Sequence, residues 1–117
     1  MANRVDGRKL GRKTGPRMAL YRNLTVAVLR YEQVKTTEAR AKEVRGRVER
    51  MITLAKDGSL TARRRVVAEM PDEPLVIDKL FKEIAPRYAD RTSGFTRLVR
   101  ICMRSGDAAP IVQIELV

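Results

Sequence analysis

A stripe of apolar residues in the middle of the chain constrains the fold more than any other feature. Its members recur at intervals of three and four residues, which is the spacing of one face of an α-helix. They are Ala41, Val44, Val48, Met51, Ile52 and Ala55. Thr36 or Thr37 can cap the start of this helix, and Asp57-Gly58 can end it by supplying a left-handed residue. Because helices in proteins are held mainly by packing of their apolar face, other elements must cover this stripe.

The N-terminal segment predicts a tail followed by a helix. Within residues 1–15, Val5 and Leu10 are the large apolar side chains that follow the first methionine, too few to support a core, so we expect an extended basic tail. Gly15-Pro16 favours a helix start, since proline is tolerated at the first helical position, and the helix is predicted over residues 16–31. Its apolar face gathers Leu20, Tyr21, Leu24, Ala27, Val28 and Tyr31, and its opposite face gathers Arg22, Asn23 and Arg30.

The remaining segments predict short helices and strands. Residues 33–36, with β-branched Val34 and Thr36, favour a brief strand. Ser59 can cap a third helix that carries Arg63-Arg64-Arg65, and a fourth helix is expected over residues 75–84. Residues 96–104 and 111–117 are rich in β-branched side chains and are joined by a turn over residues 105–110, so they predict an antiparallel pair.

These elements together predict an α+β fold of two layers. Their order is helix, strand, three helices and two antiparallel strands, which gives a small three-stranded sheet packed on helices. A chain of 117 residues has room for one hydrophobic core. We therefore expect a single globular domain over residues 16–117, preceded by the basic tail of residues 1–15.

Positive charge is concentrated in the N-terminal half. The chain carries 25 Lys and Arg against 14 Asp and Glu, a net charge of +11. Residues 1–50 hold 14 bases and 5 acids, whereas residues 51–117 hold 11 and 9. Hydrophobic residues make up 44%, so this charge sits on a folded domain. Such a charge favours a polyanionic partner, and a nucleic acid is the expected one.

Several classes of function are excluded by the residues that the chain lacks. Cys102 is the single cysteine and there is no histidine, which removes a disulfide framework, a zinc finger and a Cys/His catalytic pair. The carboxylates are scattered, so we expect no metal site, no cofactor, no small-molecule substrate and no enzymatic activity. The apolar runs are too short for a signal peptide or a membrane span, and we expect a cytoplasmic protein without membrane contact. Cys102 is expected to be a buried thiol on its strand.

The bases differ in their value as nucleic-acid contacts. Glycines interleave with the bases of residues 1–15, which lets the backbone approach a phosphate chain closely. Arg63-Arg64-Arg65 can equally be a solvated helix face. On the second helix, Glu38 with Lys42 and Glu43 with Arg47 are spaced to form ion pairs, so its bases are weaker candidates.

Three rival functions follow from the same composition. A DNA-binding regulator could use the second and third helices as a helix-turn-helix, because charge alone does not separate DNA from RNA. A ribonuclease or nucleotidyl enzyme would need paired carboxylates or a general base. A chain that binds only proteins would leave the net charge of +11 without a role.

An ordered series of short segments along the whole chain resembles the bacterial large-subunit ribosomal protein L-seventeen family. The segments are Gly7-Arg8-Lys9-Leu10, Arg17-Met18-Ala19-Leu20-Tyr21-Arg22-Asn23, Val34-Lys35-Thr36-Thr37, Ala41-Lys42-Glu43-Val44-Arg45, Ile52-Thr53-Leu54-Ala55-Lys56, Lys79-Leu80-Phe81, Ala85-Pro86-Arg87-Tyr88, Gly94-Phe95-Thr96-Arg97 and Ile114-Glu115-Leu116-Val117. The resemblance implies the two-layer arrangement described above. It also implies binding to 23S ribosomal RNA in the large (50S) subunit near the peptide exit tunnel, beside neighbouring large-subunit proteins. The family usually has histidines where this chain has Asn3 and Pro16.

From the charge pattern and this resemblance we predict twelve RNA-binding residues. Five belong to the tail, four to the first helix, and one each to the first strand, the third helix and the strand that begins near position 96. They are Arg4, Arg8, Lys9, Arg12, Lys13, Arg17, Arg22, Asn23, Arg30, Lys35, Arg64 and Arg97.

Overall fold

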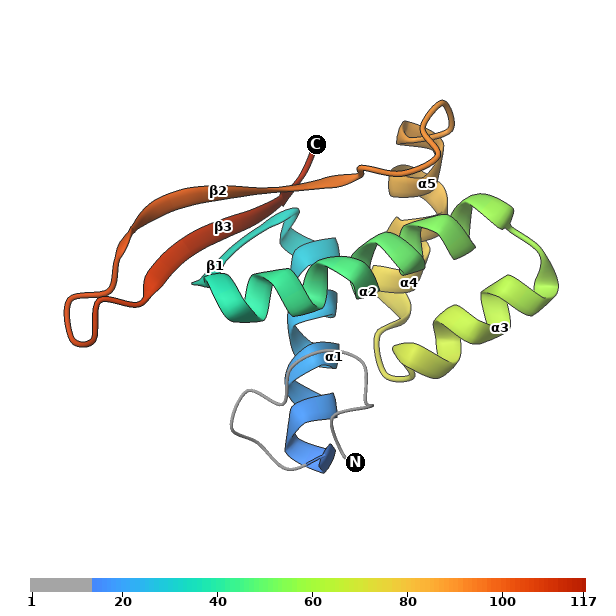
Figure 1. Cartoon of the computed structure of the whole chain (residues 1–117). Helices are drawn as coiled ribbons and strands as arrows, with labels where there is room; N and C mark the ends of the chain where they lie inside the picture. The colour runs from blue at the N-terminus through green and yellow to red at the C-terminus, as the bar shows by residue number, and fades with distance from the viewer. Residues whose placement is uncertain (1–13) are drawn as a thin grey trace, which may run out of the picture.

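The computed structural model describes residues 14–117, which form helices on one side of a small sheet (Figure 1). The elements in chain order are α1 (Thr14–Tyr31), β1 (Gln33–Thr37), α2 (Glu38–Asp57), α3 (Leu60–Glu69), α4 (Pro74–Lys79), the π-helical segment η2 (Leu80–Ile84), α5 (Ala85–Arg87), β2 (Thr96–Met103) and β3 (Pro110–Leu116). This order confirms the predicted α+β fold of two layers.

Helix α2 is the element around which the others pack. Its stripe from Ala41 to Ala55 is buried, as the spacing predicts, and it contacts α1, α3, η2, α5 and all three strands. The helix ends at Gly58, whose φ of 69° is a left-handed conformation that glycine adopts without strain. The Gly58 N–H donates to the Leu54 carbonyl at 3.2 Å, which closes the last turn.

Helix α1 is buried on more sides than its sequence predicts. It starts at Thr14 and its second half contacts α2, α4, β1 and β3. Thr25, Val26 and Leu29 are therefore buried in addition to the expected Tyr21 and Val28. Tyr31, which was expected on the apolar face, is 64% exposed because it lies at the end of the helix. A helical wheel identifies one apolar face, but it cannot predict that several neighbouring elements bury other sides of the same helix.

The third and fourth helical segments follow the predicted starts but not every predicted end. Ser59 caps α3, since its Oγ accepts a hydrogen bond from the Ala62 N–H at 3.1 Å. The fourth helix continues past the expected end at Ile84 and runs through Pro86 to Arg87. It does so through the wider π turn η2, in which the Ala85 N–H bonds to the Leu80 carbonyl. That turn lies directly before Pro86, whose ring would clash in a regular α-helix.

The sheet is antiparallel, with the strand order β1-β3-β2. Val112, Ile114 and Leu116 alternate along β3 on the face that packs against the helices, and all three are buried. The remaining β3 side chains face away from the helices. The last strand in the chain is thus the central one.

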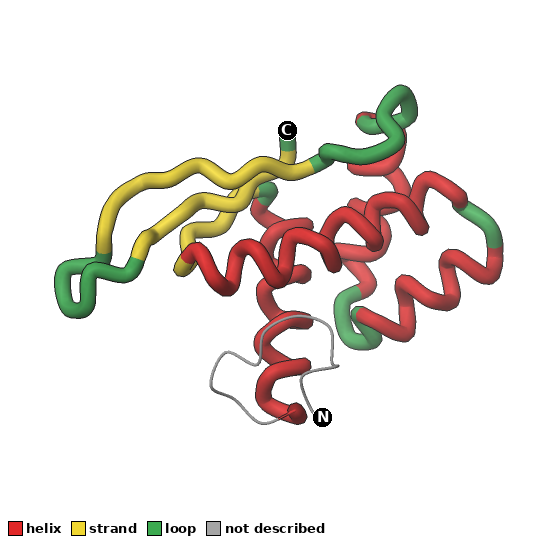
Figure 2. Tube along the Cα trace, in the orientation of Figure 1, coloured by secondary structure: helices red, strands yellow, loops and turns green. Residues whose placement is uncertain are grey.

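The β2–β3 hairpin extends beyond the helical layer, as Figure 2 shows. From Val99 onward, every β2 residue is exposed, and a β-bulge between Arg100 and Cys102 breaks the simple alternation. Cys102 is exposed, so the prediction of a buried thiol was wrong. Cys102 is exposed because β2 continues past the helices that would otherwise cover it.

Candidate nucleic-acid interface

The basic side chains of residues 14–117 fall into two groups according to whether a carboxylate lies beside them. One group is neutralised by ion pairs within the fold, and its members are Arg30, Lys42, Arg45, Arg47, Arg63, Lys79, Arg87, Arg97, Arg100 and Arg104. The predicted pair of Lys42 with Glu38 is among them, at 3.0 Å. The ion pair recorded for Arg47 joins it to Glu69 of α3 at 3.6 Å.

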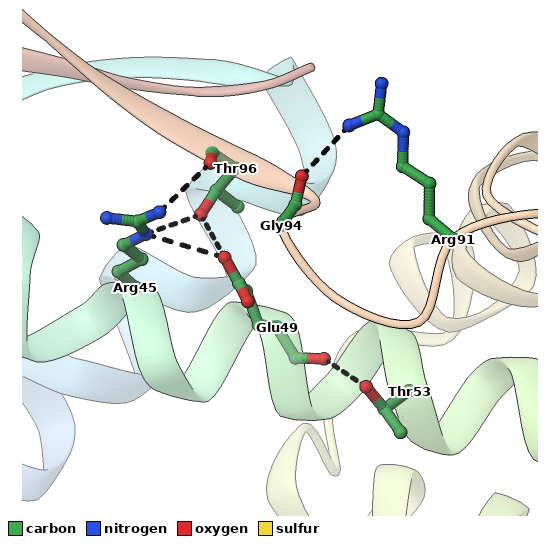
Figure 3. A network of polar contacts seen from close by, with 6 residues as sticks. All are labelled: Arg45, Glu49, Thr53, Arg91, Gly94 and Thr96. Atoms are coloured by element: carbon green, nitrogen blue, oxygen red, sulfur yellow. Dashed lines mark hydrogen bonds and ion pairs between the residues drawn. The ribbon is translucent and has the colours of Figure 1, made fainter.

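A polar network joins α2 to the start of β2 and engages one of these paired arginines (Figure 3). The Thr96 hydroxyl donates to Glu49 Oε2 at 2.8 Å. Arg45 Nε lies 3.4 Å from the same carboxylate and 3.2 Å from Thr96 Oγ1. The guanidinium of Arg45 is thus engaged by the fold and is a weak candidate for contact with a polyanion.

A second ion-pair cluster holds the junction between α1 and β1. Glu32 lies between these elements with a φ of 66°, and its carboxylate pairs with Arg87 at 2.5 Å and with Lys79 at 3.1 Å. The hydrogen bond from Arg87 is the main cause that lowers the pKa of Glu32 to about 2. Arg87 and Lys79 therefore stabilise this junction and are weak candidates for contact with a polyanion.

The unpaired bases include two arginines that meet where α1, α2 and α3 come together. A small pocket of about 20 Å³, with room for about one water molecule, lies there, and its lining residues are Arg22, Thr25, Arg47, Arg50, Met51, Glu69 and Met70. Arg22 comes from α1 and Arg50 from α2, and neither has an ion pair with any carboxylate of residues 14–117. The packing of α1 on α2 thus brings arginines that are far apart in the sequence to one pocket.

Two other predicted residues share the face of the sheet that points away from the helices. Lys35 pairs with Gln113 across the β1–β3 ladder, and Arg97 pairs with Glu115 across the β2–β3 ladder. Gln113 and Glu115 both lie on the outward face, so Lys35 and Arg97 lie there too. Lys35 and Arg97 are exposed, but Arg97 Nε lies 3.3 Å from Glu115, which offsets part of its charge.

The structure thus places the predicted contacts of the domain at several separate positions. Arg22 and Asn23 are exposed neighbours on α1, and Arg64 is exposed on α3. Arg30 is exposed but donates to Glu73 at 2.6 Å. Arg17 is 6% exposed and its Nε has no hydrogen-bond partner within the part of the chain that the structure describes. The predicted contacts Arg4, Arg8, Lys9, Arg12 and Lys13 lie outside the described residues.

Sequence reasoning missed Arg50, which lines the same pocket as Arg22. A signal was available in the helical spacing. The positions four residues from Arg50 are Gly46 and Leu54, and those three residues away are Arg47 and Thr53. With no acid at these distances, Arg50 cannot form an ion pair along its own helix. This spacing distinguishes Arg50 from Lys42, Arg45 and Arg47 of the same helix, which form ion pairs within residues 14–117.

Residues 14–117 contain neither a candidate metal site nor a helix that could cross a membrane. No group of three or more Cys, Asp or Glu side chains lies close enough to hold a metal ion. None of the helices in this range combines the length and the apolar composition that crossing a bilayer requires.

Comparison with known proteins gives one consistent family. The family model described as "Ribosomal protein L17" matches residues 20–117. A protein of Desulfitobacterium hafniense is 54% identical over 110 residues, which cover 94% of this chain and 97% of the relative. A protein of Moorella thermoacetica is 51% identical over the same shares of the two chains. A protein of Dehalococcoides mccartyi is 44% identical over 117 residues, with 100% and 99% coverage. All three are named "Large ribosomal subunit protein bL17".

The family model matches most of the part of the chain that the structure describes. It begins within α1 and continues through β3, so it includes the arginines of the pocket and the sheet that packs on α2. Relatives with identities of 44% to 54% over nearly the full length share one fold and one family. The chain therefore belongs to the ribosomal protein L17 family.

Proposed function

We propose that this protein is a structural constituent of the large ribosomal subunit that binds 23S ribosomal RNA near the peptide exit tunnel. The observation that carries the proposal is the 54% identity, over 94% of the chain, to a protein named for the large subunit. Proteins of this family are structural components of the ribosome, which in bacteria is cytoplasmic, and are not enzymes.

The distribution of charge supports RNA as the direct partner. The net charge of +11 remains after the carboxylates have neutralised as many bases as they can, and the fold pairs many of those carboxylates internally. Arginines that have no ion pair within residues 14–117 then stay exposed on α1, α2 and α3. Neutralising phosphates with such side chains releases counterions from RNA, which favours binding.

The neighbouring large-subunit proteins are proposed as further partners. The exposed side chains of the projecting β2–β3 hairpin include Val99, Ile101 and Met103, which are 39%, 43% and 56% exposed. Apolar side chains on an extension of this kind suit contact with another protein better than contact with phosphates.

Co-sedimentation tests the assignment to the large subunit. Tagged protein expressed in its native host should stay in the large-subunit peak of a sucrose gradient after a high-salt wash. Recovery in the small-subunit peak, or release into the free-protein fractions at moderate salt, would contradict the proposal. Purified 23S RNA should then bind the isolated protein more tightly than duplex DNA of the same length, which separates this function from a DNA-binding regulator.

The location near the exit tunnel is tested by directed cleavage from Cys102. This residue is exposed and is the single cysteine of the sequence, so a cleavage reagent attached to its thiol reports one position. We expect strand breaks in 23S RNA segments that surround the tunnel exit. Breaks confined to other regions would refute the location and leave the binding of 23S RNA intact. A Cys102→Ser protein treated in the same way gives the background.

A further inference from the structure

We propose that the mouth of the small pocket between α1, α2 and α3 binds one phosphate of the RNA backbone, shared between the guanidinium groups of the exposed Arg22 and Arg50. The inference rests on the proposed function as an RNA-binding protein and assigns one contact within it. It concerns a place where the fold, and not the sequence order, brings two unpaired cations together.

The cations of the pocket have different roles. Arg47 makes three contacts within the fold. Its guanidinium lies 5.0 Å from the Tyr21 ring centroid, and its Nη2 lies 3.3 Å from Met18 Sδ. Its Nη1 lies 3.6 Å from the Glu69 carboxylate. Its charge is offset by that carboxylate. Arg22 from α1 and Arg50 from α2 have no such offset from residues 14–117, so the pocket keeps an excess of two positive charges.

The chemistry of the pocket selects a phosphate over a base. Met51 and Met70 are buried and apolar, and the hydroxyl of buried Thr25 already donates to the Tyr21 carbonyl at 2.7 Å. The Glu69 carboxylate is paired with Arg47, so the groups of the pocket left without a partner in residues 14–117 are the N–H groups of Arg22 and Arg50, which are donors only. A base edge presents donors and acceptors together, whereas a phosphate presents acceptors and a negative charge. The planar fork of arginine matches the two free oxygens of a phosphodiester.

The surroundings of Arg22 also determine the side from which an anion arrives. A second hollow borders Arg22 on its other side, and its lining residues are Arg22, Asn23, Val26, Met70, Pro71, Asp72 and Glu73. Glu73 there is paired with Arg30, but Asp72 has no ion pair within residues 14–117. A carboxylate in that hollow repels phosphate. An anion is therefore attracted to the pocket that Arg22 shares with Arg50.

The test compares 23S RNA binding by matched arginine variants at several salt concentrations. The double variant Arg22→Gln/Arg50→Gln should lose roughly tenfold in affinity at low salt, because charge-assisted hydrogen bonds to one phosphate are removed. The slope of log affinity against log salt should shrink by about 0.7 to 0.9, the value for one phosphate contact. Each single variant should give most of this loss, since the two side chains share one ligand.

A control double variant, Arg40→Gln/Arg65→Gln, removes the same charge outside the pocket, from two arginines without ion pairs in the described range. It should change the affinity much less. An equal loss in both double variants would mean a general charge effect and would overturn the pocket. A slope that shrinks by about two would mean two separate phosphates and would overturn the shared site.

Two further measurements separate the possible failures. Circular dichroism spectra and melting temperatures of the variants should match the wild type, because Arg22 and Arg50 are exposed. The variant Arg22→Lys/Arg50→Lys keeps the charge but not the planar fork, so it should retain most of the slope and bind more weakly than wild type. If wild-type protein binds 23S RNA and the glutamine double variant binds equally well, the pocket proposal fails alone. If wild-type protein does not bind, the proposed function fails with it.

Discussion

The carboxylate of Glu32 lies 2.5 Å from the guanidinium of Arg87, and this pair joins the end of α1 to the end of the fourth helical segment. Lys79 reaches the same carboxylate from α4 at 3.1 Å. The backbone of Glu32 takes part as well, since its N–H donates to Val28 and its carbonyl accepts from the Leu116 N–H at 3.0 Å. One residue thus connects two helical segments and the sheet.

The first prediction concerns the pH dependence that this pair introduces. The pKa of Glu32 is about 2 in the folded protein, below its ordinary value of 4.5, chiefly because of the hydrogen bond from Arg87. Between these values the unfolded chain binds a proton that the folded protein does not. The stabilisation is therefore complete above about pH 4.5 and is lost as the pH falls toward 2.

Glu32→Gln removes this stabilisation at neutral pH. We expect a decrease in unfolding free energy of about 1 kcal/mol or less, since the pair is partly exposed and solvent screens it. The difference from wild type should vanish near pH 2, which denaturant titrations at several pH values can measure. Glu83→Gln is the control, because this exposed carboxylate has no ion pair within residues 14–117. A constant difference between Glu32→Gln and wild type at all pH values would contradict the argument.

The second prediction concerns the core beneath α2. Ile52 is completely buried and belongs to the stripe that predicts this helix. Truncation to alanine removes apolar contacts and leaves a cavity, which should cost roughly 2 to 5 kcal/mol of unfolding free energy. Thr53→Ala is the neighbouring control, because Thr53 is exposed and its side chain bonds only to the Glu49 carbonyl of its own helix at 3.0 Å. A cost for Ile52→Ala below that of this control would show that the stripe is not held as described.

The third prediction follows from the exposure of Cys102. Cys102→Ser should change the unfolding free energy by less than about 0.5 kcal/mol, as for most surface substitutions. A thiol reagent should react fully with the native protein, as measured by mass spectrometry without denaturant. A thiol that reacts only after unfolding would mean that the hairpin packs against other residues.

The fourth prediction concerns the basic segment that precedes α1. Deleting residues 2–13 removes Arg4, Arg8, Lys9, Arg12 and Lys13 and keeps the whole of α1. If most of these bases touch phosphate, the salt slope for 23S RNA should shrink by roughly 2 to 4 units. Circular dichroism should barely change. An unchanged slope in the truncated protein would assign RNA binding to residues 14–117 alone.

The fold was predictable from the sequence wherever the determining interaction is local. The three-and-four stripe predicted α2, Gly58 its end and Ser59 the start of α3, because helix periodicity and capping depend on residues within a few positions of each other. The order of helices and strands followed from the same signals. The extension of the fourth helix past Pro86 was not predictable, since it depends on a π turn that accommodates the proline ring.

The candidate site was predictable only in part, because its residues come from three helices whose packing the sequence does not specify locally. Arg22 was predicted from its position opposite the apolar face of α1, and the structure leaves it unpaired within residues 14–117. Arg30 was predicted for the same reason, yet it pairs with Glu73, which follows it by 43 residues. Arg50 was overlooked because its importance depends on where α1 crosses α2. Ion pairs between distant segments decide which cations remain available.

The position of β3 between β1 and β2 has a consequence for how the protein is made. Translation proceeds from the N-terminus, so both edge strands are synthesised before the strand that joins them. Until β3 emerges, β1 and β2 have no hydrogen-bonding partner in the sheet, whereas α2 and α3 can already pack against each other. The sheet can therefore close only after β3 has been synthesised, and a chain that ends before β3 would expose two unpaired strand edges to aggregation and proteolysis.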